Sequence, residues 1–138
     1  MANSIIPGCG VTYIALNASD FDRSVRFYTE GLGFTVFRKW GNPGRQIALL
    51  DSGDGTCIEL FSDAKPGDVN GTLAGGFAHL AFHVTDAEAA YDRAIAHGAG
   101  SKIPPKRVDI QSDPVLPVKL AFVTGPDGEE LEFFQVLA

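Results

Sequence analysis

Apolar and polar positions in the first half of the chain predict a strand, a helix and then further strands. Residues 11–18 mix β-branched and apolar side chains and predict a strand. Asp20 follows it with a side-chain oxygen that can cap a helix. Over residues 21–32, apolar side chains recur at spacings of three and four, which predicts that helix, and Gly33 can end it with a positive φ.

The second half repeats this pattern. Residues 77–85 predict a strand, Asp86 a cap, and the residues before Gly98 a second helix. The repeat extends to single positions, because residues 13–20 correspond one by one to residues 79–86. The chain therefore contains two copies of one small unit.

Each copy continues with short strand-like runs between turn-forming residues. The further strands are expected at 34–40, 46–50 and 56–61 in the first half, and near 102–103 and at 118–124 and 130–136 in the second. The fold class is then α+β, a single domain over residues 1–138 made of two βαβββ modules at about 8–63 and 74–138. Residues 62–76 are expected to form a linker, and residues 104–117, with four prolines, a surface loop.

Four polar residues occupy equivalent places on four of these strands: Tyr13, Glu59, His79 and Glu132. Side chains alternate across a strand, and the faces opposite these four are wholly apolar, so we expect those faces to lie against the helices. The polar four then share the other face of each sheet with several Phe side chains. A carboxylate in such surroundings is costly unless it is paired or binds a metal, and an aromatic wall with a few polar groups is typical of a small-molecule site.

Composition excludes several classes of partner. The net charge is -6 and the eleven Lys and Arg residues are scattered, which argues against nucleic acid and anionic membranes. No apolar run is long enough to span a bilayer, and the N-terminal residues do not have the pattern of an export signal, so a cytoplasmic location is expected. Cys9 and Cys57 are expected to be reduced thiols, and Cys57 a small buried residue rather than a nucleophile.

The chain resembles the vicinal oxygen chelate superfamily, also called the glyoxalase, bleomycin-resistance and dioxygenase family. The similar segments are residues 19–34, 76–82 and 125–133, and the resemblance covers nearly the whole chain. It implies two βαβββ modules whose curved mixed sheets enclose a pocket for a small-molecule substrate. It also implies a homodimer with the site at or near the interface.

The resemblance further implies a divalent metal ion, Ni, Co, Zn, Mn or Fe, held by one side chain from each of four strands. Glu59, His79 and Glu132 match three of these positions, and Tyr13 stands where His or Gln is expected. A phenol ordinarily loses its proton only at about pH 10, so Tyr13 could ligate as a phenolate, could hydrogen-bond a metal-bound water, or could mark a site without metal. By the same resemblance Glu132 would be a ligand that doubles as the catalytic base, with Glu59 as a ligand and possible second acid or base.

Three functions remain open. The first is a metal-dependent lyase or isomerase, lactoylglutathione lyase-like, that stabilises an enediolate on an α-oxygenated substrate. The second is a metal-free protein that sequesters a ligand, similar to the bleomycin-resistance proteins and suggested by Tyr13, Trp40 and the Phe residues. The third, an extradiol dioxygenase, requires a second histidine, for which His83 is the candidate.

Two features bear on the substrate. Glutathione-using members commonly have a basic residue and an asparagine to hold the tripeptide carboxylates, whereas this chain has Asn17 and Asp63 at those places, and Asp63 would repel an anion. Arg38, Lys39 and Arg45 offer another way to bind a carboxylate, although charged residues in a hairpin are usually solvated.

Overall fold

The computed structural model describes residues 1–62 and 77–137. The first module forms a four-stranded sheet, which we call sheet A, with strand order β1-β4-β3-β2. Its strands are β1 (Tyr13–Asn17), β2 (Thr35–Asn42), β3 (Arg45–Asp51) and β4 (Cys57–Phe61). β1 is parallel to β4 and the other pairs are antiparallel, so the sheet is mixed.

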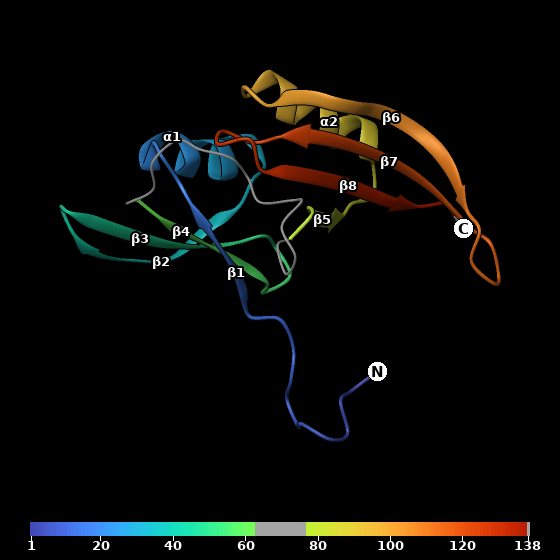
Figure 1. Ribbon diagram of the computed structural model, residues 1–138, viewed down its shortest axis with the longest axis horizontal. Helices are drawn as coiled ribbons and strands as arrows, with labels where there is room; N and C mark the ends of the chain where they lie inside the picture. The colour runs from blue at the N-terminus through green and yellow to red at the C-terminus, as the bar shows by residue number, and fades with distance from the viewer. Residues whose placement is uncertain (63–76, 138) are drawn as a thin grey trace.

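The second module repeats this topology as sheet B, with strand order β5-β8-β7-β6. Its strands are β5 (Leu80–His83), β6 (Gly100–Ile110), β7 (Leu116–Thr124) and β8 (Glu130–Val136). β5 is parallel to β8, as β1 is to β4. Figure 1 shows the two sheets as separate parts of the ribbon, and the predicted pair of βαβββ units is confirmed.

In each module, the helical segment follows the first strand along the chain. α1 (Phe21–Arg26) continues into η1 (Phe27–Gly31), a turn of π-helix, and α2 (Ala87–Ala96) belongs to the second module. Asp20 and Asp86 cap α1 and α2, since their carboxylates accept bonds from the amides of Arg23 and Ala89. None of the helices in the described residues is long and apolar enough to cross a bilayer.

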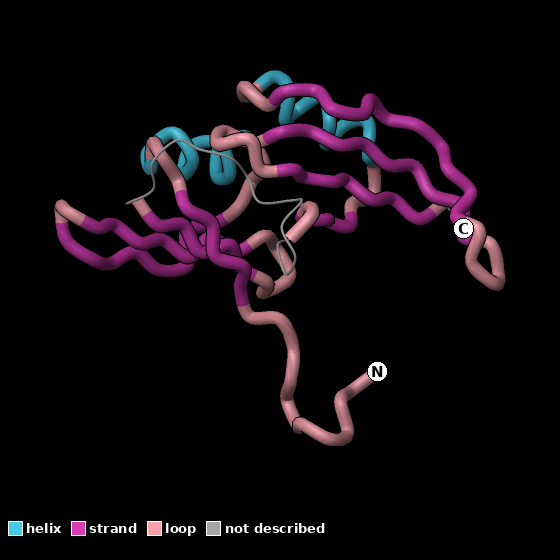
Figure 2. The backbone as a smooth tube through the Cα atoms, viewed as in Figure 1, coloured by secondary structure: helices cyan, strands magenta, loops and turns pink. Residues whose placement is uncertain are grey.

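The apolar strand faces pack against the helices, as the sequence predicts. One core cluster includes Ile58 and Leu60 of sheet A, Leu131 and Phe133 of sheet B, and residues of both helical segments such as Tyr28. We call the opposite side of each sheet its open face. Figure 2 shows the N-terminal loop residues running away from both sheets.

Polar contacts join the two modules on the helix side. The Arg93 guanidinium of α2 donates to the carbonyls of Glu30 and Gly31, both at 2.9 Å. Gly31 suits this junction because a Cβ there would lie 3.0 Å from Cβ of His97. The modules are therefore fixed through their helices, and their open faces remain uncovered by the helices.

Three sequence expectations differ from the structure. Residues 104–110 are not loop but part of β6, because β6 is an edge strand and Pro104 and Pro105 lie at a register shift where no ladder bond is required. β5 is shorter than predicted, so His79 directly precedes it. The first helix changes to π-helix at Phe27. The expected linker lies almost wholly outside the described residues.

Candidate metal half-sites on the open faces

Tyr13 and Glu59 lie on the open face of sheet A. In the β1–β4 pairing Tyr13 is opposite Cys57 and Ala15 is opposite Glu59, so Tyr13 and Glu59 are diagonal neighbours. Tyr13 is 46% exposed, whereas Glu59 is only 8% exposed. Within the described part of the chain, no hydrogen-bond or ion-pair partner is found for the Glu59 carboxylate. Such a group is costly to bury and is suited to a ligand that neutralises it.

His79 and Glu132 lie together on the open face of sheet B. Nε2 of His79 is 3.0 Å from Oε2 of Glu132, and the imidazole packs edge-on against Phe122 of β7. Glu132 is 7% exposed, and the His79 side chain is 38% exposed. The pair therefore combines a buried carboxylate with an imidazole that solvent can still reach.

The four residues form two pairs and not one cluster. Across the described residues, no three His, Cys, Asp or Glu side chains converge well enough to hold an ion. The His79–Glu132 pair nevertheless suits a divalent metal, because two ligands with bonds of about 2.1 Å to one ion lie roughly 3 Å apart, as these two do. Tyr13 and Glu59 belong to sheet A, whereas His79 and Glu132 belong to the sheet B side.

Cys57 shares the open face of sheet A with Glu59 but lacks the surroundings of a nucleophile. Burial, followed by the charges of Asp51 and Asp54, raises the pKa of the Cys57 thiol above its ordinary value. The reactive form of a cysteine is the thiolate, which these surroundings disfavour. Cys57 is therefore a packing residue of β4.

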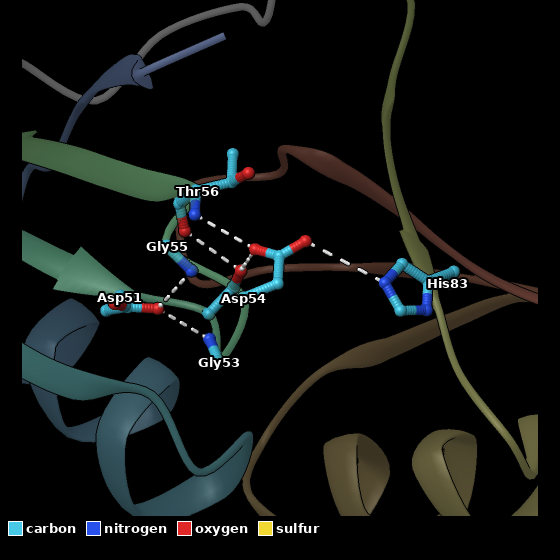
Figure 3. Close-up of polar contacts among 7 residues, drawn as sticks. Asp51, Gly53, Asp54, Gly55, Thr56 and His83 are labelled. Carbon is cyan, nitrogen blue, oxygen red and sulfur yellow. Dashed lines mark hydrogen bonds and ion pairs between the residues drawn. The ribbon is translucent and has the colours of Figure 1, made fainter. Parts of the chain in front are cut away.

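A cavity of about 480 Å³ lies elsewhere, at the junction of the modules. It is lined by core residues such as Ile58 and Phe82, and contains none of the four predicted ligands. Asp54 of the β3–β4 turn and His83 also line this cavity. Figure 3 shows the two side chains facing each other, and Nε2 of His83 is 3.7 Å from Oδ2 of Asp54. His83 is therefore directed to this turn, and the dioxygenase set that would include it gains no support.

A cluster that sequence reasoning missed joins the β7–β8 turn to the start of α1. The Asp127 carboxylate accepts bonds from the amide and hydroxyl of Ser19, and Arg23 donates to the carbonyl of Pro126 at 2.9 Å. Burial raises the pKa of neighbouring Glu129 to about 7. The Gly125-Pro-Asp-Gly sequence predicts the turn, but nothing local to it indicates that helix α1 covers it.

Comparisons with known proteins agree with this architecture. Residues 10–133 match the Glyoxalase/Bleomycin resistance protein/Dioxygenase superfamily. The chain is 33% identical to the uncharacterised protein YaeR of Escherichia coli, over 91% of this chain and 95% of that protein. It is 30% identical to a probable lactoylglutathione lyase of Vibrio parahaemolyticus, over 91% of this chain and 89% of that protein. A crystal structure of a glyoxalase family protein from Enterococcus faecalis superimposes with a TM-score of 0.73 at 29% identity, over 93% and 98% of the two chains.

Proposed function

Because the chain belongs to the glyoxalase, bleomycin-resistance and dioxygenase superfamily, we propose that it is a divalent-metal-dependent lyase or isomerase of the lactoylglutathione lyase type. The observation that supports this most directly is the pair of buried carboxylates, Glu59 and Glu132, on the two open faces. A core built only for stability would not keep two acids at those places, because each costs free energy. The 30% identity to a probable lactoylglutathione lyase supports the class of reaction.

The proposed active unit is a homodimer. Tyr13 and Glu59 of one protomer would face His79 and Glu132 of its partner, since one chain holds these residues on separate sheets. Exposed aromatic side chains on sheet A, including Tyr13 and Trp40 at 46% and 47% exposure, would be covered by this association. Two equivalent sites per dimer follow from the two-fold symmetry of such a pair.

Glu59, His79 and Glu132 would hold the ion, with Tyr13 beside it. A divalent ion held there would polarise two neighbouring substrate oxygens and so favour the enediolate form of the substrate. The Glu132 carboxylate is the group that we assign to move the proton between the adjacent carbons. His79, 3.0 Å from Glu132, orients that carboxylate. Glu59 is a ligand and a possible second acid or base on the opposite side of the substrate.

Direct measurement of metal binding tests this proposal. Protein that has been stripped with a chelator is titrated with Ni²⁺, Co²⁺, Zn²⁺ and Mn²⁺ by calorimetry, and one ion per chain is expected for at least one metal. Glu59→Gln and His79→Ala should each weaken binding at least a hundredfold. His83→Ala is the matched control, because His83 faces Asp54 instead, and it should leave the affinity unchanged.

Failure of every metal to bind at low micromolar concentration would refute the metal-dependent activity. The second candidate, a metal-free ligand-sequestering protein, is favoured by the half-exposed Tyr13 and Trp40. This second function would be supported if Glu59→Gln and His79→Ala left the affinity for an aromatic ligand unaltered.

A further inference from the structure

A β-bulge in β2 decides which basic side chains of the β2–β3 hairpin share a face with Glu59. Val36 pairs with Leu50, but the next pair is Arg38 with Leu49, so Phe37 is an extra residue. An extra residue shifts every following side chain of its strand to the other face. Bulges are frequent beside functional sites, where they re-aim side chains.

Arg38 therefore points to the open face of sheet A. Leu49, its partner on β3, is in turn opposite Glu59 on β4, so Arg38, Leu49 and Glu59 form one row across the sheet. Strands lie about 4.8 Å apart, which places Arg38 and Glu59 roughly 10 Å from each other along the row. The guanidinium of Arg38 lies 4.7 Å from the ring centroid of Phe37.

Trp40 and Lys39 confirm the effect of the bulge. Trp40 pairs with Ile47 in the neighbouring row, and is therefore on the same face as Arg38. Lys39 pairs with buried Ala48 and its ammonium lies 5.8 Å from the ring centroid of Phe21 on α1, which is the helix side. Without the extra residue, Lys39 and not Arg38 or Trp40 would belong to the Glu59 face.

Arg38 has no carboxylate partner among the residues that the structure describes. The polar contact found for its guanidinium is a long one, 3.5 Å to the carbonyl of Phe37. The protein carries a net charge of -6, yet this face holds the guanidinium of Arg38 and also that of Arg45, which lies 4.6 Å from the ring centroid of Phe61. Arginine binds a carboxylate with two parallel hydrogen bonds. The Phe37 ring supplies apolar surface beside the Arg38 guanidinium, and Trp40 lies two residues further along the same face.

We propose that Arg38 binds a carboxylate of the substrate, at the far end from the oxygens that meet the metal ligands. The substrate class is then a carboxylate whose vicinal oxygens are separated from the carboxylate by an apolar spacer. This inference rests on the proposed metal-dependent function, and assigns Arg38 the role of a specificity-determining residue. It also separates Arg38 from Lys39, which the sequence alone presents as equivalent.

The test uses two hydroxamates, which present two neighbouring oxygens to a metal. Benzohydroxamate has a neutral ring, whereas 4-carboxybenzohydroxamate carries a carboxylate on the far side of it. Binding of both to metal-loaded protein is measured by calorimetry. The carboxylate should tighten binding about tenfold in the unaltered protein, as a charge-assisted bidentate pair does.

Three variants complete the experiment. Arg38→Gln should lose the tenfold gain while it binds benzohydroxamate normally, which also shows that the variant is folded and loaded. Arg38→Lys should keep only part of the gain, because a point charge replaces the planar fork. Lys39→Gln is the control on the opposite face and should keep all of it.

The two proposals fail in different ways. If benzohydroxamate binds but the carboxylate adds nothing, or if the gain survives in Arg38→Gln, the role of Arg38 is overturned and the metal site stands. If neither hydroxamate binds metal-loaded protein, vicinal-oxygen chelation itself is refuted, and the assignment of Arg38 with it.

Discussion

His79 and Glu132, 53 positions apart in the chain, bring Nε2 and Oε2 to 3.0 Å on the open face of sheet B. The parallel pairing of β5 with β8 produces this contact, because it sets Ala81 beside Glu132. His79, two residues before Ala81 and on the same face, is then diagonal to Glu132. β1 and β4 make the equivalent arrangement in sheet A, with Tyr13 near Glu59. The two candidate half-sites have the same strand pairing, and differ in the side chain that lies beside the carboxylate.

Tyr13 is the position where the two half-sites differ, and Tyr13→His would make them alike. A neutral imidazole is a better ligand than a phenol for Ni²⁺, Co²⁺ and Zn²⁺. We expect Tyr13→His to tighten Ni²⁺ binding by on the order of tenfold, about 1.4 kcal/mol, in a calorimetric titration. Tyr13→Phe is the control, since it removes the hydroxyl without adding a ligand. Weaker binding by Tyr13→His than by Tyr13→Phe would contradict the placement of this residue beside the ion.

Glu129 makes stability depend on pH. Burial raises its pKa from about 4.5 to about 7, so the folded state favours the neutral carboxyl. The associated stability is complete below pH 4.5 and is lost as the pH rises through about 7. Glu129→Gln keeps an acceptor for the Asp127 amide without the charge.

Urea unfolding at two pH values measures this effect. Glu129→Gln should be more stable than the unaltered protein by about 2 kcal/mol at pH 8, and close to it at pH 4.5. This stability difference is smaller than the full pKa shift would give, because solvent reaches part of the Glu129 side chain. An equal difference at both pH values would mean that Glu129 does not titrate in this range.

The Tyr28 hydroxyl is buried without a hydrogen-bond partner in the described structure. Its ring packs against Phe27 and Phe34, at centroid distances of 5.1 Å and 5.5 Å, so the apolar part of the side chain is well placed. An unpaired buried hydroxyl costs about 1 kcal/mol or more. Tyr28→Phe should therefore raise the free energy of unfolding by about 1 kcal/mol. A loss of stability of that size would instead reveal a partner for the hydroxyl.

Local patterns were sufficient to predict most of the strands, because alternation and helix spacing are properties of neighbouring residues. The caps at Asp20 and Asp86 and the apolar faces of β4 and β8 were predicted for the same reason. The strand through Pro104 was not, since a proline is tolerated there only because β6 is at the edge, which depends on the order of distant strands.

The places of the candidate site residues were predictable to a similar extent. Periodicity and the internal repeat identified the open faces and the two acids, but not that the four residues divide into two pairs. The orientation of Arg38 depends on a bulge that only the pairing with β3 reveals. The raised pKa of Glu129 comes mainly from burial, which depends on tertiary packing and not on the local sequence of the turn.

The proposal that each metal site combines residues of two protomers is tested most directly by mixing two variants, each of which lacks one proposed metal ligand. Glu59→Gln and His79→Ala chains are mixed, subunit exchange is confirmed by native mass spectrometry, and Ni²⁺ capacity is measured. Random pairing makes half of the dimers mixed, each with one intact site, so about a quarter of the original capacity should return.

The matched control mixes His79→Ala with Glu132→Ala, which lie on the same half, and should restore nothing. A site shared between protomers predicts recovery of Ni²⁺ capacity in the first mixture and none in the second. Each variant alone should bind no Ni²⁺. If subunit exchange is confirmed and the first mixture still recovers no Ni²⁺ capacity, a site shared between protomers is contradicted.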